Sequence, residues 1–197
     1  MSLILEKKLP LGHFLVYDEK PPFPCRSVKQ VHGKEVVLVI DKNQYTDDLE
    51  ADGLMMIHMN DMPILAIKTA DCLPITVIGE RGVALLHAGW RGVKEKIILQ
   101  KKITALEPHY FYIGPHIQSC CYEVQESFLE NFPNSLHFKK EKNNIYFSLL
   151  AVIHSQINEH FPNAKIEHSE ICTHCDNDFH SYRRNKTEKR NWNLLLC

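Results

Sequence analysis

A histidine and an arginine flank a tight glycine-rich turn at residues 86–92, which read Leu-His-Ala-Gly-Trp-Arg-Gly. The apolar run at residues 83–86 predicts a buried strand before this turn, and helical periodicity begins near Val93. His87 therefore stands where a strand ends, and Arg91 stands where a helix begins. A helix N-terminus attracts anions, and a guanidinium adds a charge and a fork of donors. The junction predicts a metal ligand beside a binding point for phosphate or carboxylate.

Two residues elsewhere in the chain share the context of His87. His32 and Cys72 each stand next to a predicted strand, beside a turn residue or an acid. Zinc takes imidazole nitrogen and thiolate sulfur, and catalytic zinc sites use three protein ligands and keep a fourth position open. The three residues suit that chemistry, although they are far apart in sequence. The alternative is three unrelated residues, with Cys72 packed as a small buried apolar side chain.

Candidate proton carriers and anion-binding residues are also present. Asp52 and Asp71 each follow an alanine at a predicted strand end, where a carboxylate either acts as a general base or caps a turn. A basic cluster near the C-terminus forms either a solvated surface or, with Arg91, a phosphate-binding group of guanidinium forks. The cluster contains Tyr182, Arg183, Arg184, Lys186, Lys189 and Arg190.

Residues 172–175 read Cys-Thr-His-Cys, the spacing of a metal or redox motif. A structural zinc site requires two more ligands. His180 is one candidate, whereas Cys120 and Cys121 are adjacent and make a poor second chelating pair. A thioredoxin-type motif needs a βαβ context at the start of a helix, which this position near the C-terminus does not offer. We therefore favour reduced structural cysteines.

Composition limits the classes of partner. The chain has 197 residues, twelve histidines, seven cysteines and a net charge of −1, which excludes the basic surface of a nucleic-acid-binding protein. No run approaches the roughly 20 apolar residues of a membrane span, and the first residues lack the order of a signal peptide. An odd cysteine count without such a signal favours reduced thiols in the cytoplasm. We expect a cytoplasmic monomer or weak homo-oligomer that binds a small molecule, without nucleic acid or membrane.

Short apolar runs separated by tight turns predict a strand-rich first half of an α+β fold. The expected strands lie at residues 14–17, 35–40, 54–57, 64–67, 75–78, 83–86, 110–113 and 166–171, with residues 192–196 closing a sheet edge. The expected helices lie at residues 93–106, 126–132 and 148–161, the last with Ser148 as its cap.

Taken together, six motifs in a fixed order make the chain similar to a known family. These are Gln30–Gly33, Ala51–Gly53, Thr69–Pro74, His87–Gly92, Ile113–Pro115 with Cys121–Val124, and Cys172–Thr173 with Ser181–Arg184. The set resembles the YfiH-like laccase-domain family, also labelled multicopper polyphenol oxidase or peptidoglycan editing factor, over about residues 28 to 192. The resemblance implies one α/β domain over residues 1–197, with a central mixed β-sheet, flanking helices and a zinc site on His32, Cys72 and His87.

The resemblance also implies a function. The family is described as purine nucleoside phosphorylases that cleave adenosine, inosine, guanosine and methylthioadenosine with phosphate, and that also deaminate adenosine. The older label predicts a copper-dependent polyphenol oxidase, which needs histidine pairs two positions apart, and this sequence has none. A non-enzymatic, metal-stabilised interaction protein is the third interpretation. The chain departs from the family pattern at His116 and in Thr187–Asn191, where Arg190 is retained.

Under the main hypothesis, zinc lowers the pKa of a bound water toward about 7 for deamination. Asp71 or Asp52 moves the proton. For phosphorolysis, Arg91 binds phosphate together with the basic cluster. Tyr182 or Trp90 stacks on the purine, although packing in the core is an equal alternative for Trp90.

Overall fold

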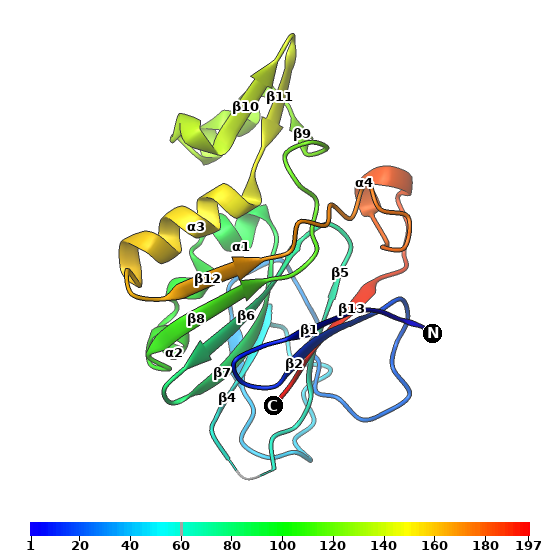
Figure 1. The fold of residues 1–197 in the computed structure, drawn as a ribbon, viewed down its shortest axis with the longest axis vertical. Coiled ribbons are helices and arrows are strands. Elements are labelled where there is room, and N and C mark those ends of the chain that lie inside the picture. The colour runs from blue at the N-terminus through cyan, green and yellow to red at the C-terminus, as the bar shows by residue number, and fades with distance from the viewer. Residues whose placement is uncertain (60) are drawn as a thin grey trace.

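The computed structural model describes residues 1–59 and 61–197, and its largest β-sheet has six strands in the order β12-β8-β6-β7-β4-β3 (Figure 1). The strands are β3 (Val36–Leu38), β4 (Gly53–Ile57), β6 (Leu73–Gly79), β7 (Gly82–Ala88), β8 (Pro108–Ile113) and β12 (Lys165–His168). The pairs β3–β4 and β12–β8 are parallel, whereas β4–β7, β6–β7 and β6–β8 are antiparallel. The predicted α+β class with a mixed sheet is therefore confirmed.

Strands β6 and β7 form the centre of this sheet and are buried along their whole lengths. Alternate side chains of a strand point to opposite faces. Accordingly, Ile75 and Val77 belong to one apolar cluster, while Ile78 and Val83 belong to a second cluster on the other face. Because both faces are covered, these strands read as continuous apolar runs in the sequence.

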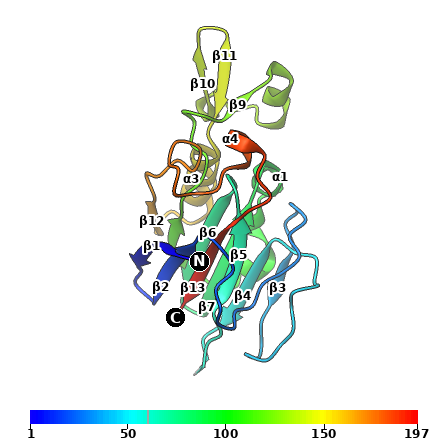
Figure 2. The ribbon, with the colours of Figure 1, turned by 90° about the vertical axis from the view of Figure 1, so that its right-hand side faces the viewer.

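A four-stranded antiparallel sheet covers the second cluster, in the order β1-β2-β13-β5 (Figures 1 and 2). Its strands are β1 (Leu3–Lys8), β2 (His13–Tyr17), β5 (Leu65–Thr69) and β13 (Asn191–Leu196). The expectation that residues 192–196 close a sheet edge was wrong, because β13 pairs with β2 on one side and β5 on the other. Its interior position follows from its pairing with β2 and β5, which lie far from it in sequence.

Short helices and one long helix pack against the first cluster. They are α1 (Trp90–Lys94), the 3₁₀ turn η1 (Ile97–Leu99), α2 (Lys101–Thr104) and α3 (Leu149–His160). The predicted cap of α3 is confirmed, because Ser148 accepts a hydrogen bond from the Ala151 N–H at 3.1 Å. The single helix expected over residues 93–106 was wrong. Lys96 adopts a left-handed φ of 57° and Gln100 is extended, so the segment breaks twice while still burying its apolar side chains.

A small three-stranded sheet projects beyond α3 at one end of the molecule (Figures 1 and 2). It contains β9 (Glu123–Val124), β10 (Phe138–Glu141) and β11 (Asn144–Phe147), in the order β10-β11-β9. Residues Glu126–Asn131 (η2) and Ser135–His137 (η3) are 3₁₀ helices, so the helix expected at residues 126–132 is present as a 3₁₀ helix that ends at Asn131. The remaining helix, α4 (Tyr182–Asn185), is one turn long. Within the described residues, no helix has the length and apolar content to cross a membrane.

Candidate metal centre and substrate cavity

Strand pairing alone brings three of the predicted site residues to one end of the large sheet. Gly53 lies opposite Leu86, and Pro74 lies opposite His87. Both β4 and β6 therefore begin where β7 ends. Asp52 immediately precedes β4 and Cys72 immediately precedes β6, so both residues must lie close to His87.

The three predicted metal ligands converge at this end. The side-chain donor atoms of His32, Cys72 and His87 all lie within 4.8 Å of one another. The two imidazole rings meet edge to face, with their centroids 4.8 Å apart. Two nitrogen donors and one sulfur donor thus face a common point that a single metal ion can occupy.

Asp52 holds two of these ligands in place. Its buried carboxylate accepts a hydrogen bond from His87 Nδ1 at 2.7 Å and others from the backbone N–H groups of Val31, His32 and Gly33 at 3.3, 2.9 and 2.6 Å. Burial raises the pKa of Asp52, but the bonds from His87 and Gly33 hold it below its ordinary value. An ionised carboxylate only accepts, so Nδ1 of His87 carries the proton and Nε2 is left for a metal.

This arrangement corrects one expectation about Asp52. The carboxylate lies outside the cavity lining, and both of its oxygens already accept hydrogen bonds inside the protein. The structure thus places the Asp52 carboxylate against His87 and the turn at residues 31–33 and does not bring it to the cavity.

The backbone beside the ligands is strained. His32 and Asp71 have φ values of 61° and 93°, in the left-handed region that residues with a Cβ rarely adopt. Gly89 keeps the ligand pocket open in another way. A Cβ at this position would lie 3.2 Å from Cys72 Sγ and 3.3 Å from His32 Cδ2. A side chain at position 89 would therefore crowd two of the predicted metal ligands.

Cys72 and His87 shift each other's titration. Burial raises the pKa of the Cys72 thiol, but the charge of His87 and a hydrogen bond from His32 outweigh it and bring the pKa to about 6. Burial lowers the pKa of His87, while the Cys72 charge and the Asp52 hydrogen bond raise it to about 9. Without metal, the pair at neutral pH is therefore a thiolate beside an imidazolium, and a metal that binds Nε2 of His87 displaces the proton there.

The metal ligands form part of the wall of a cavity of about 520 Å³, within the range of small-molecule sites. The other lining residues are Lys29, Gln30, Lys68, Ala70, Asp71, Ile117, Tyr122, Leu149, Tyr182, Arg183, Glu188 and Arg190. The cavity thus combines a metal-binding group, several cations and an apolar wall.

Four of the predicted substrate-site residues line this cavity: Asp71, Tyr182, Arg183 and Arg190. The buried Asp71 carboxylate accepts hydrogen bonds from Thr173 Oγ1 at 2.8 Å and from the Arg183 N–H at 2.7 Å. These bonds hold the segment that carries Tyr182 and Arg183 against the turn between β5 and β6. Asp71 is the predicted carboxylate that faces the cavity.

The other two predicted arginines lie elsewhere. Arg91 is exposed, and its guanidinium lies 5.0 Å from the centroid of the Trp90 ring. Trp90 itself packs against the apolar cluster under α3. The Arg184 guanidinium donates to backbone carbonyls within residues 173–179. The structure therefore brings neither arginine into the cavity, and Arg184 has a structural role.

Sequence reasoning missed Gln30, Lys68 and Tyr122 as cavity residues. The Gln30 amide donates to the Lys68 carbonyl oxygen at 2.7 Å and accepts from the Lys68 N–H at 2.8 Å, which fixes the two segments together. Gln30 and Lys68 could have been identified from their proximity in sequence to the predicted metal ligands. Gln30 lies two residues before the ligand His32, and Lys68 lies four residues before Cys72.

The model of a protein family described as "Multi-copper polyphenol oxidoreductase laccase" matches residues 19–196. A protein of Aquifex aeolicus named purine nucleoside phosphorylase is 33% identical over 166 residues, covering 82% of this chain and 77% of that protein. One of Borreliella burgdorferi with the same name is 32% identical over 172 residues, covering 80% of this chain and 72% of that protein.

Solved structures show the same fold. The hypothetical protein YfiH of Bacillus licheniformis superposes with a TM-score of 0.73 at 26% identity, covering 86% of this chain and 72% of that one. YlmD of Geobacillus stearothermophilus superposes with a TM-score of 0.71 at 27% identity, covering 86% of this chain and 73% of that one.

Proposed function

This chain belongs to the family described as multi-copper polyphenol oxidoreductase laccase, and we propose that it is a zinc-dependent purine nucleoside phosphorylase. One observation carries the proposal. The metal-binding group of His32, Cys72 and His87 opens into a cavity that also holds the cations of Arg183 and Arg190. The names of the relatives from Aquifex aeolicus and Borreliella burgdorferi support the same reaction.

The donor set fits zinc. Two imidazoles and one thiolate are donors that zinc accepts, and three protein ligands leave a coordination position toward the cavity. The hydrogen bond that His87 Nδ1 donates to Asp52 supplies the outer support that such a ligand needs. When bound, zinc supplies a Lewis acid that polarises an oxygen of phosphate or water.

Phosphorolysis forms a bond between a phosphate oxygen and C1′ of the ribose while the bond from C1′ to the purine nitrogen breaks. The bonding electrons leave with the purine, which takes up a proton. The chain's part is to hold phosphate against C1′, and we assign this to Arg183 and Arg190, with Lys68 nearby on the same cavity wall. Guanidinium groups suit phosphate because they donate two parallel hydrogen bonds.

The apolar part of the cavity suits the purine. Tyr122, Tyr182 and Leu149 line it, and the aromatic rings offer faces on which a base can stack. We assign to Asp71 the delivery of the proton that the leaving purine takes up. Deamination of adenosine uses the same groups, since water adds to C6, ammonia leaves and Asp71 moves the proton between them.

The test measures release of free purine from adenosine, inosine, guanosine and methylthioadenosine by zinc-loaded protein, with and without phosphate. We expect phosphate-dependent release, loss of activity in Cys72→Ala and unchanged activity in Cys25→Ala, whose thiol lies outside the cavity. Absence of both base release and deamination in zinc-loaded protein would refute the proposal. Oxygen uptake with phenols by copper-loaded protein would favour the oxidase instead.

A further inference from the structure

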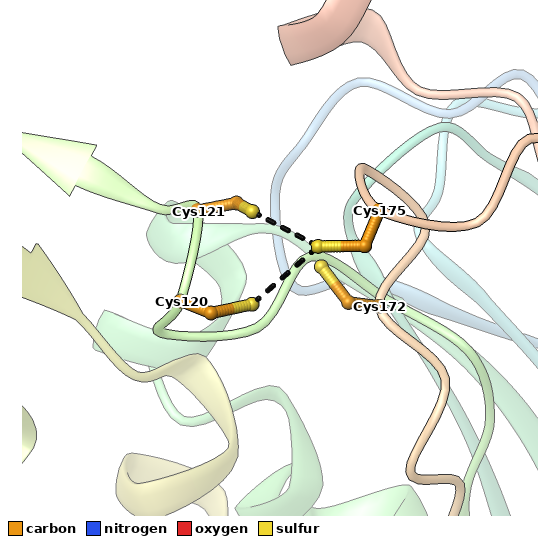
Figure 3. Close-up of side chains that lie close together, drawn as sticks. All are labelled: Cys120, Cys121, Cys172 and Cys175. Atoms are coloured by element: carbon orange, nitrogen blue, oxygen red, sulfur yellow. Dashed lines mark hydrogen bonds between the residues drawn. The ribbon is translucent and has the colours of Figure 1, made fainter.

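Four cysteines from two distant segments converge at one point that is separate from the cavity lining (Figure 3). Cys120 and Cys121 come from the turn after β8, and Cys172 and Cys175 from the turn after β12. Their sulfur atoms all lie within 4.8 Å of one another. The view that adjacent Cys120 and Cys121 make a poor second pair was therefore wrong. His180 takes no part, because its Nε2 is hydrogen-bonded to the Asp18 carbonyl oxygen at 2.8 Å.

We propose that these four thiolates bind one structural zinc ion, at a second site distinct from the group of His32, Cys72 and His87. A tetrahedral site with zinc–sulfur bonds of about 2.3 Å places its sulfurs roughly 3.8 Å apart. Cys175 Sγ lies 3.8 Å from Cys120 Sγ and 3.2 Å from Cys121 Sγ. The sulfurs are thus close to the spacing of a shared tetrahedral ion, whereas a disulfide would join only two of them at about 2.05 Å.

Backbone pairing explains how the two segments meet. β12 runs parallel to β8, and the pairing continues past the strands, where His116 pairs with Cys172. The Thr173 N–H donates to the His116 carbonyl oxygen at 3.0 Å. The two turns are therefore held side by side by the sheet itself, so the site is preformed and binding does not have to order the chain.

Local turns aim the sulfurs at one point. The N–H groups of Cys121 and Tyr122 both donate to the Gln118 carbonyl oxygen at 3.0 Å, and this tight turn directs both neighbouring thiols toward Cys175 (Figure 3). On the other segment, the Cys175 N–H donates to the Cys172 carbonyl oxygen at 3.1 Å. The turn geometry thereby removes the usual objection to adjacent cysteines as joint ligands.

Donors beside the cluster can stabilise negative charge on its sulfurs. The Gln118 N–H donates to Cys172 Sγ at 3.4 Å. Four thiolates and one Zn²⁺ carry a net charge of −2. The Arg184 guanidinium, which donates to carbonyl oxygens of the Cys172–Cys175 turn, supplies compensating charge.

The proposed ion would fasten two parts of the cavity wall. Tyr122, which lines the cavity, directly follows Cys121. Thr173, which donates to Asp71, lies between Cys172 and Cys175. A metal joining the two turns would therefore fix the positions of Tyr122 and Asp71 without touching the substrate.

The test titrates metal-free, reduced protein with Co²⁺, whose spectrum reports the ligand set, and measures zinc content after reconstitution. We expect two ions per chain in the wild type. Cys172→Ser/Cys175→Ser should bind one ion and lack the sulfur-rich spectrum. Cys72→Ala should also bind one ion but keep that spectrum. The control Cys25→Ser/Cys197→Ser removes two thiols outside the cluster and should still bind two.

The Co²⁺ spectrum of Cys72→Ala tests the second site even if the Cys172→Ser/Cys175→Ser variant fails to fold. A wild type that binds one ion, together with a Cys72→Ala variant that binds none, would overturn the second site while leaving the proposed function intact. A disulfide to Cys175 that persists in protein prepared without oxidant, detected by mass, would also overturn it. Iron in place of zinc in freshly isolated protein would overturn the choice of metal.

Discussion

Replacing Asp52 with asparagine tests how the metal centre is held, because it removes one charge and changes little volume. Asp52 accepts two hydrogen bonds at each oxygen: His32 N–H and His87 Nδ1 at Oδ1, and Val31 N–H and Gly33 N–H at Oδ2. Asparagine offers one acceptor oxygen and one NH₂ donor. Whichever way the amide turns, its NH₂ meets groups that donate.

If the amide oxygen faces His87, the N–H groups of Val31 and Gly33 lose their acceptor. A buried unpaired N–H costs about 1–3 kcal/mol, and Val31 is 46% exposed, so the variant should lose on the order of 2–4 kcal/mol of unfolding free energy. If the NH₂ faces His87 instead, Nδ1 must accept and the ring proton moves to Nε2. Nε2 then has no lone pair with which to bind the metal. Loss of such outer support lowers metal affinity roughly 10–100-fold.

The assay is a competition titration of zinc against a chromophoric chelator, run beside thermal unfolding to establish that the variant is folded. Asp71→Asn is the matched control, since Asp71 bonds to Thr173 and Arg183 rather than to His87. We expect the control to keep its zinc affinity and lose turnover. A folded Asp52→Asn protein with wild-type zinc affinity would refute the assigned role of Asp52.

Three further predictions follow from single contacts. Gly89→Ala should weaken zinc binding, because its Cβ would lie 3.2 Å from Cys72 Sγ. The control is Gly33→Ala, whose Cβ would make only ordinary contacts from 3.5 Å. Equal zinc affinities in the two variants would contradict the steric argument. Arg190→Gln should raise the KM for phosphate roughly tenfold or more and leave the KM for nucleoside unchanged. Arg184→Gln should instead lower the melting temperature, because its guanidinium bonds to backbone carbonyls. Initial rates test the first variant and thermal unfolding tests the second. Burial lowers the pKa of His116 to about 4, so the unfolded chain binds the proton at a higher pH than the folded chain does. The free energy of unfolding should therefore fall by about 3 kcal/mol as the pH drops from about 6.5 to about 4. Denaturant unfolding at a series of pH values measures this, and a pH dependence that is as steep in His116→Leu as in the wild type would disprove it.

Local sequence patterns were informative where a segment's neighbours are also close in sequence. The β6–β7 hairpin and the Ser148 cap of α3 follow from apolar runs and cap chemistry alone. The position of β13 depended on its pairing with β2 and β5, which lie far from it in sequence. The broken helix depended on the backbone of Lys96, a residue whose type favours helix.

For the site, the sequence predicted which residue types matter better than it predicted where their side chains point. The motifs containing His32, Cys72 and His87 identified three residues that the structure brings together. Arg91 and Arg184 had the right chemistry, but their direction depends on packing against Trp90 and the Thr173 turn. The sequence contained all four cysteines of the cluster but did not predict that their sulfurs meet, because this depends on the pairing of β12 with β8.

The place of β13 between β2 and β5 has a consequence for how the protein is made. A ribosome delivers β2 and β5 long before their common partner, so both present open edges while the large sheet is being synthesised. Open edges invite pairing with other chains. Arg190, a cavity residue, directly precedes β13, so the strand that closes the sheet also delivers a substrate-binding group. A chain that ends before residue 190 should therefore leave the edges of β2 and β5 open and lack Arg190 in the cavity.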